Sequence, residues 1–259
     1  MKKLMIAASA ALIATVGFSL ESANVVGYSE CATTNGFKAM GASFAPVGLS
    51  MNLQDLRVTG YNHEDGFEGD LNIQFLDGLG RMDEMYFWID IPADPEDPDS
   101  VAFYGWYDGN DNLAENKTIA PCDGLWVSSS SQLFGLQSSG QVITAPSSKN
   151  LGNEEFVMVA NPLPIDVDIQ DISVKGYDYD SGFEGDLNVQ FLDTLGRMDE
   201  MYFWIDIPAD PEDPDSVAFY GWYDGNDTLV ENVFVGSGCA IWVYSNSNSY
   251  ELEFPGVNL

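Results

Sequence analysis

The chain has 259 residues, a formal net charge of −32, and a content of 45% hydrophobic and 13% aromatic residues. This charge excludes a protein that binds nucleic acid or an anionic lipid surface, because both would be repelled. The apolar content excludes a disordered chain, so the charge must lie on the surface of a protein with an extensive core.

The first 23 residues have the pattern of a secretory signal peptide. Lys2 and Lys3 precede an apolar run from Leu4 to Phe18, and small residues follow, which favours cleavage near positions 19–23. The run is too short to span a membrane and no second one follows, so we expect a soluble mature protein without a membrane span. We expect it to be secreted or at the cell surface, with the periplasm as the alternative. Loss of the two lysines brings the net charge to about −34.

The mature chain is a tandem repeat with a shift of 116 positions and no gap. Only 6 of the 36 positions in 24–59 match their counterparts, whereas 49 of the 57 positions in 60–116 match. Identity falls again after position 116. We therefore expect two modules of one fold, at 24–139 and 140–259.

One segment within the repeat is unchanged between the copies. The sequence "LGRMDEMYFWIDIPADPEDPDSVAFYGWYDGND" occupies 79–111 and recurs letter for letter at 195–227. A simple duplication should leave the flanks as similar as the middle. Local identity therefore indicates either gene conversion of this segment or a requirement that both copies share.

Alternation of apolar and polar residues predicts strands, and helical periodicity is almost absent. Gly, Asn and Asp clusters at 77–80 and 108–111 predict turns between them. Short strands at close spacing predict an all-β fold, with a β-sandwich or barrel in each module. The expected strands of the first copy are 71–75, 85–91, 101–107, 124–127 and one ending at Val142.

An acidic loop joins two of these strands. Pro92, Pro95 and Pro98 recur at every third position, which favours an extended polyproline-type loop. Clustered oxygen ligands suit Ca²⁺, although the turn at Asp108 lacks the glycine and glutamate of a calcium loop. The alternative is a solvated acidic loop with diffuse counterions. The candidate calcium ligands are Asp94, Glu96, Asp97, Asp99, Asp108, Asn110 and Asp111, with Asp210, Glu212, Asp213, Asp215, Asp224, Asn226 and Asp227 in the second copy.

The strands on either side of this loop place four aromatic residues on one face, if they pair as neighbours. An exposed patch of this kind, edged with carboxylates, would bind extracellular glycans by ring stacking. It could equally bind a second copy of this protein or another surface protein. The alternative is burial of both strand faces. The residues are Tyr86, Trp88, Tyr104 and Trp106, repeated as Tyr202, Trp204, Tyr220 and Trp222.

The chain has three cysteines, so in an oxidising compartment at most two of them can form a disulfide within the chain and one remains unpaired. A Cys31–Cys122 bond with Cys239 free is one expectation, and three buried thiols are the other. No CxxC spacing is present, so a zinc site is not expected.

No catalytic signature accompanies these features. His63 is the only histidine, Tyr179 replaces it in the second copy, and no serine or cysteine has a plausible base. We expect a non-enzymatic structural or interaction protein of the cell surface or secreted matrix, self-associating or binding partners, with calcium as a candidate cofactor. The alternative is a bivalent carbohydrate-binding protein that uses the repeated Trp/Tyr patches.

Four segments carry a family resemblance: "ESANVVGY", "FVMVANPLP", "NVQFLDTLGRMDEMYFW" and "GCAIWVYSNSNSYELEFPGV". The chain resembles a tandem-repeat member of the secreted "ANVVGY"-type β-sandwich proteins of Verrucomicrobia- and Lentisphaerae-like bacteria. The first copy departs from the pattern, with "AMGASFAPVG" in place of the "VANPLP" segment. The resemblance implies export and a β-sandwich fold, and it implies no particular activity.

Overall fold

The computed structural model describes residues 26–33, 36–41, 44–45, 50–62, 69–129, 132–177, 185–193, 196–213 and 215–257, with side chains from Ser50 onward. The expected signal peptide and His63 lie outside these ranges. None of the described residues lies in an α-helix, and the helical elements among them are two short 3₁₀ turns, η1 (Leu53–Asp55) and η3 (Ile169–Asp171). The prediction of an all-β fold is confirmed.

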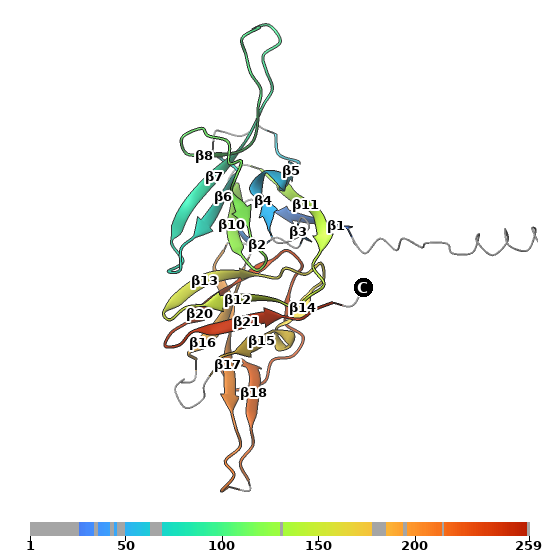
Figure 1. Ribbon diagram of the computed structural model, residues 1–259. Helices are drawn as coiled ribbons and strands as arrows, with labels where there is room; N and C mark the ends of the chain where they lie inside the picture. Colours follow the sequence, from blue (N-terminus) through green and yellow to red (C-terminus); the bar gives the residue numbers. More distant parts are fainter. Residues whose placement is uncertain are drawn as a thin grey trace, which may run out of the picture.

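The strands before position 143 form one set of sheets (Figure 1). The larger sheet has the order β2-β10-β6-β7-β8, the smaller one β1-β11-β3 with β5 also on β11, and β4 pairs with β9. The bounds are β1 (Val26–Thr33), β2 (Gly36–Gly41), β3 (Phe44–Ala45), β4 (Met51–Asn52), β5 (Arg57–Thr59), β6 (Asn72–Leu76), β7 (Met82–Ile91), β8 (Phe103–Asp108), β9 (Thr118–Ile119), β10 (Gly124–Ser129) and β11 (Phe134–Val142).

The later strands repeat this arrangement. The larger sheet has the order β13-β20-β16-β17-β18, the smaller one β12-β21-β15, and β14 pairs with β19. We call the two sets the first and the second module. The bounds are β12 (Ser147–Leu151), β13 (Glu155–Ala160), β14 (Val167–Asp168), β15 (Ser173–Lys175), β16 (Leu187–Leu192), β17 (Met198–Ile207), β18 (Phe219–Tyr223), β19 (Phe234–Val235), β20 (Ala240–Ser245) and β21 (Tyr250–Phe254).

The ungapped alignment is wrong for the equivalent strands β2 and β13. Gly124 pairs with Gly41 in the first module, whereas its counterpart Ala240 pairs with Ala160. Ala160 lies 119 positions after Gly41, not 116, so these strands are offset by three residues. A strand pairs by backbone bonds and not by residue identity, so an offset of this kind is absorbed in the following loop.

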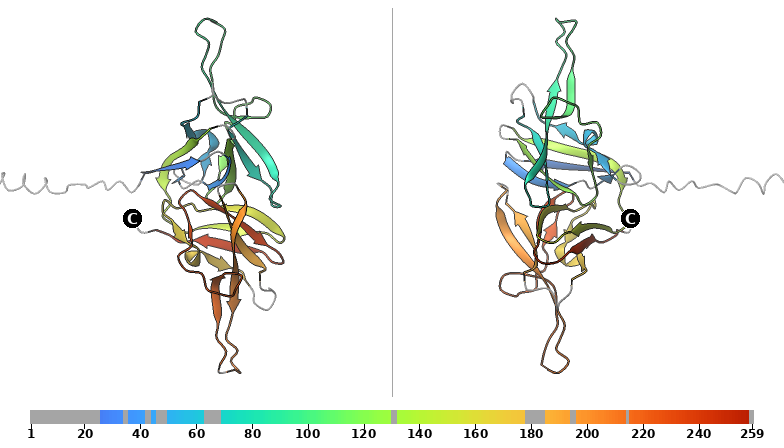
Figure 2. Two further views of the ribbon diagram at one scale, coloured as in Figure 1. Left: turned by 180° about the vertical axis from the view of Figure 1, so that it is seen from behind. Right: turned by 60° about the vertical axis from the view of Figure 1, so that its left-hand side comes forward.

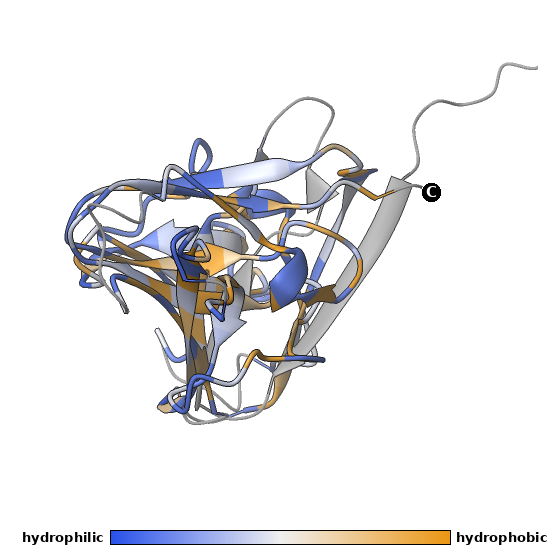
Figure 3. Ribbon diagram, turned by 90° about the horizontal axis from the view of Figure 1, so that it is seen from below, coloured by the Kyte–Doolittle hydropathy of each residue, from blue (hydrophilic) through white to orange (hydrophobic). Residues whose placement is uncertain are grey.

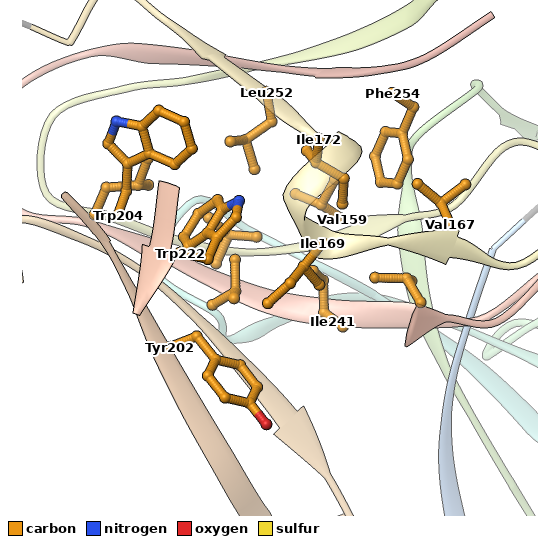
Figure 4. Packing of buried hydrophobic residues seen from close by; sticks show 14 of the residues in the cluster. Val159, Val167, Ile169, Ile172, Tyr202, Trp204, Trp222, Ile241, Leu252 and Phe254 are labelled. Atoms are coloured by element: carbon orange, nitrogen blue, oxygen red, sulfur yellow. The ribbon is translucent and has the colours of Figure 1, made fainter. Parts of the chain in front are cut away.

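Each module encloses an apolar core between its sheets. Trp88, Trp106, Ile73, Val127 and Leu136 belong to the first core. The second core is centred on the counterparts Trp204 and Trp222, which lie among Ile169, Ile172, Ile241 and Leu252 (Figure 4). Apolar residues gather in the strands of the interior, and many hydrophilic residues lie around them (Figure 3).

The two modules pack through their larger sheets, with equivalent residues facing each other. Trp126 and its counterpart Trp242 are in contact, with ring centroids 6.1 Å apart. Phe156 stacks on Trp242 at 4.4 Å, and its backbone N–H donates to the Gly78 oxygen at 2.9 Å. Such a symmetric contact resembles the interface of a two-fold dimer and directs the two halves in opposite directions.

The consequence is a molecule with a long hairpin at each end (Figure 1, Figure 2). We call residues 82–108, which comprise β7, its following loop and β8, the first arm. Residues 198–224, with β17 and β18, form the second arm. The unchanged segments 79–111 and 195–227 therefore contain both arms in full.

Candidate functional site: the two arms

The tip of each arm is closed by its own hydrogen bonds. The Asp94 N–H donates to Ser100 Oγ at 2.8 Å, and the Asp97 and Ser100 N–H groups donate to the Asp94 and Asp97 carbonyls at 3.2 and 3.0 Å. The prediction of an extended polyproline-type loop is wrong, because the chain forms two successive turns here. The second tip has the same bonds between Asp210, Asp213 and Ser216.

Carboxylates in the tip stabilise these turns. Asp94 Oδ1 accepts the Glu96 N–H at 2.8 Å, and Asp97 Oδ1 accepts the Asp99 N–H at 3.0 Å. An aspartate that bonds the backbone two residues ahead mimics a backbone turn. The acidic residues of the tip therefore contribute to its shape as well as to its charge.

The aspartate at the base of the arm has a similar role. Asp108 Oδ1 accepts the N–H groups of Asn110 and Asn112 at 2.8 and 2.9 Å, and these bonds lower the pKa of its carboxyl. Asp111 follows in the left-handed region, at φ 61°. Asp224 accepts the corresponding bonds from Asn226 and Thr228, and Asp227 has φ 58°.

The candidate calcium ligands fall into two separate groups in each arm. Asp94, Glu96, Asp97 and Asp99 lie at the tip, and Asp108, Asn110 and Asp111 lie at the far end of β8. The six residues of β8 span roughly 20 Å. In the part of the chain with described positions, no group of three or more His, Cys, Asp or Glu side chains could hold a metal ion.

The strands of each arm pair as predicted, but the tryptophans lie in the core. Trp88 lies opposite Trp106, and both are buried, at 5% and 0% exposure. Trp204 and Trp222 are buried in the same way. The expectation of an exposed face that includes these rings is wrong and the alternative, burial, holds for the tryptophans, because this face of the larger sheet covers the smaller sheet.

What remains exposed on the arm is a set of apolar side chains nearer the tip, on both faces of the hairpin, because the adjacent residues Phe103 and Tyr104 point to opposite sides of β8. Tyr104 is 60% exposed, and Val101, Phe103 and Ile91 are also exposed. In the second arm Tyr220, Val217 and Phe219 are exposed to a similar degree, and Ile207 is half-buried. Of the two remaining candidate aromatic residues, Tyr86 packs against the first core and Tyr202 is buried in the second, and each hydroxyl donates to a neighbouring glutamate.

The outer edge of each arm's base is closed by a glutamine. Gln54 Nε2 donates to the Trp106 oxygen at 2.7 Å, and Gln54 Oε1 accepts the Trp106 N–H at 3.1 Å. Gln170 makes the same pair of bonds with Trp222, at 2.8 and 3.2 Å. We call this contact the glutamine clasp. It explains why Gln54 is one of the few early residues that both copies share.

The clasp also explains a glycine in the middle of a strand. Gly105 has φ +129°, and a Cβ atom there would lie 2.5 Å from Gln54 Oε1. Gly221 has φ +127° and the corresponding distance to Gln170 is 2.6 Å. The sequence signal was the Gln–Gly pair repeated in both copies, but its meaning depends on a contact between distant segments.

Each module contains a buried carboxylate that no sequence pattern indicated. Asp186 is fully buried and accepts bonds from the Ser247 N–H and Oγ, from Asn248 and from the Tyr250 hydroxyl. Asp70 accepts bonds from Ser129 and Tyr61, and burial, followed by the charge of Asp70, raises the pKa of Tyr61 to about 12. These bonds tie the start of β6 or β16 to neighbouring segments.

A cleft of about 290 Å³ lies where the modules meet. Its charged residues are already partnered: Asp123 pairs with Lys149 at 2.7 Å, and Glu155 accepts the Gly152 N–H at 2.5 Å. Asp77, also on the cleft, pairs with Arg81 at 2.7 Å. The cleft therefore joins the modules and presents little unused polar chemistry to a ligand.

Cys122 lies beside this cleft as a free thiol. It is fully buried in the core of the second module, so the expected Cys31–Cys122 bond is wrong. Burial, followed by the charge of Asp123, raises the pKa of the Cys122 thiol to about 12. The first module thus contributes a side chain to the core of the second.

Comparisons with known proteins do not assign a function to this arrangement. No protein-family model matches the chain, and no curated protein or solved structure matches it. Within the described ranges, no helix has the length and apolar character needed to cross a membrane.

Proposed function

We propose that this chain is a non-enzymatic, exported linking protein that binds neighbouring molecules through its two arms. The observation that carries the proposal is the position of the unchanged segment. It forms both arms, and the arms lie at opposite ends of the molecule (Figure 1, Figure 2). Behind its acidic tip each arm exposes several neighbouring apolar side chains, and exposed apolar groups of this kind often mark a binding surface.

Two equivalent sites on one rigid body make the molecule bivalent. The tight contact of Trp126, Trp242 and Phe156 holds the modules together, so the arms cannot turn toward the same point. A bivalent molecule of this shape joins two partners that lie on opposite sides of it, and it gains no avidity on a single flat surface, because only one arm can reach that surface at a time. This role fits a component of the cell surface or of a secreted matrix.

The carbohydrate-binding alternative loses its main support in this structure. It required Trp88, Trp106 and their counterparts to present open ring faces, and these rings are buried. Tyr104 and Tyr220 are the exposed rings that remain, one on each arm.

The decisive experiment varies the number of intact arms. The full chain is mixed with the extracellular fraction of the producing cells, and the size of the complexes is followed by light scattering. Three variants are compared with the wild type: Phe103→Ser with Tyr104→Ser in the first arm, Phe219→Ser with Tyr220→Ser in the second, and all four changes together.

We expect the wild type to form large cross-linked assemblies. Each single-arm variant should bind without cross-linking, and the four-fold variant should do neither. Phe234→Ser, at an exposed position outside the arms, serves as the control and should behave as the wild type. Cross-linking by the four-fold variant at the level of the wild type would show that the arms do not carry the function.

A further inference from the structure

We infer that the partner of each arm is a cationic protein surface with an apolar centre, so that one chain holds two copies of the same partner. This inference rests on the proposed function and specifies the chemistry of the partner. It combines four properties of the arms: their exposed apolar side chains, their charge, their closed edges and their rigid tips.

The apolar part of the site lies on the distal half of the arm. Ile91 and Phe103 lie directly opposite each other, and Phe103 contacts Tyr107 with ring centroids 6.1 Å apart. Tyr104 packs edge-on against Trp88 at 4.9 Å, so its ring is held in place although it is 60% exposed. Ordered, exposed aromatic side chains at the end of a projection are suited to fill a pocket on a partner.

The charge of the arm specifies the sign of the partner. Residues 82–108 contain eight carboxylates and neither lysine nor arginine, and the second arm repeats this composition. Two such arms repel each other, which disfavours a second copy of the chain as the partner. The same charge disfavours a membrane or a nucleic acid and favours a surface that carries lysine or arginine around an apolar pocket.

The closed edge of the arm specifies the mode of binding. At the base of β8, the Trp106 backbone is bonded on its outer side to Gln54 and to the Ala114 N–H, the latter at 2.8 Å. The Asp108 N–H donates to the Asn112 oxygen at 2.9 Å. A partner strand therefore cannot pair along the base of β8, and we expect binding to use the side chains of the distal arm.

The tip adds rigidity to this surface. Its two turns are fixed by the bonds of Asp94, Asp97 and Ser100 described above. A site that is already ordered loses less conformational entropy when it binds. The presence of the same bonds in the second tip means that both arms offer the partner the same preformed surface.

The test uses the full chain and short synthetic peptides as probes of partner chemistry. A peptide of alternating lysine and leucine has both required features. A lysine–serine peptide keeps the charge and removes the apolar groups, and a glutamate–leucine peptide reverses the charge. Isothermal titration calorimetry reports the number of peptides bound per chain and their affinity.

We expect two lysine–leucine peptides per chain, at least tenfold weaker binding of the lysine–serine peptide, and no binding of the glutamate–leucine peptide. Phe103→Ser with Tyr104→Ser should reduce the number bound to one, and the four-fold variant should bind none. Phe234→Ser and Leu133→Ser, at exposed positions outside the arms, should leave the number at two. Thermal unfolding shows that each variant is folded.

Other outcomes overturn the inference in distinguishable ways. Equal affinity for the two lysine peptides, or binding that persists in the four-fold variant, would show non-specific attraction to an acidic protein. Arm-dependent assembly of the chain alone in sedimentation would identify a second copy as the partner. If the peptides fail while the arms still cross-link the extracellular fraction, the partner chemistry is wrong and the linking function stands.

Discussion

The two arms have the same sequence but rest on different bases. Under the first arm, Lys117 Nζ bonds Glu84 at 2.5 Å and lies 4.0 Å from the centre of the Phe75 ring. Under the second arm, Val233 stands at the counterpart of Lys117 and packs against the core, so Glu200 has no such lysine. The comparison shows that an apolar and a charged base can support the same hairpin.

The buried tryptophans differ between the modules in a similar way. The Trp106 indole N–H donates to the Leu56 oxygen at 2.9 Å. The Trp222 indole N–H, at the equivalent position, has no acceptor among the described residues. Identical residues in the arms therefore make different contacts in the two modules.

The largest effect that we predict comes from adding a methyl group to the glycine that contacts the glutamine clasp. Gly105→Ala or Gly221→Ala places a Cβ atom against a glutamine oxygen at a φ that favours glycine. We expect each change to lower the free energy of unfolding by about 2–4 kcal/mol, from overpacking together with backbone strain. Urea unfolding measures the loss.

A matched background separates the two causes of this loss. In a Gln54→Ala background the clash with the glutamine is absent, and the backbone strain and a 3.1 Å approach to Leu113 Cδ1 remain, so Gly105→Ala should cost clearly less. An equal cost in both backgrounds would show that the clasp does not require the glycine.

Replacing the tryptophans distinguishes the two cores. Trp106→Phe and Trp222→Phe remove the same ring volume, but only the first removes a hydrogen bond and leaves the Leu56 oxygen without its donor. We expect Trp106→Phe to lower the free energy of unfolding by about 1 kcal/mol more than Trp222→Phe. Equal losses would contradict the difference between the modules.

Alkaline pH tests the buried tyrosines. Burial is the main cause that raises the pKa of Tyr61 to about 12, and it also raises the pKa values of Tyr86, Tyr202 and Tyr250. An unfolded tyrosine ionises near about pH 10, so the unfolded state loses protons first and the folded protein loses stability as pH rises from about 10 to 12. Below about pH 10 this contribution is fully present.

Phenolate absorbance and circular dichroism measure this transition together. We expect a late fraction of phenolate absorbance that accompanies loss of β structure, and a smaller late fraction in Tyr61→Phe. A single titration near pH 10 with unchanged circular dichroism would contradict the prediction.

Replacing the lysine beneath the first arm should have a smaller effect. Lys117→Met removes the pair with Glu84, whose pKa this lysine lowers, and we expect a loss of about 1 kcal/mol or less because the pair is partly exposed. The loss should shrink in a Glu84→Gln background. A loss of the same size in both backgrounds would assign the effect to packing against Phe75 instead.

Calcium should have the smallest effect of all. The candidate ligands at the tip and at the base of each arm are separated along β8, and several of them bond backbone N–H groups. We expect millimolar Ca²⁺ to change the melting temperature no more than matched Mg²⁺ does, by differential scanning calorimetry. A larger increase in melting temperature with Ca²⁺ than with Mg²⁺ would contradict this prediction and show that these carboxylates form a calcium site.

Much of the fold could be predicted from local pattern. The strands near 71–75, 85–91 and 101–107 and the turns at 77–80 and 108–111 were visible, because alternation and turn residues act over a few neighbouring positions. The site was predicted in part. The acidic tip and exposed Tyr104 lie on the arm as expected, whereas the tryptophans do not, because alternation separates two strand faces without indicating which one a second sheet will cover.

The sequence by itself determined the strand pattern, the turns, the charge of the arms and their identity in the two copies, since each depends only on residues close together in the chain. The tertiary structure alone decided that Trp88 and Trp106 are buried, that Gln54 closes the edge of β8, and that Cys122 enters the core of the other module. It also decided that the arms lie at opposite ends. These features depend on contacts between segments distant in the chain, such as the one between Gln54 and Trp106, which are 52 positions apart. Such contacts arise only when whole sheets pack to remove their apolar faces from water.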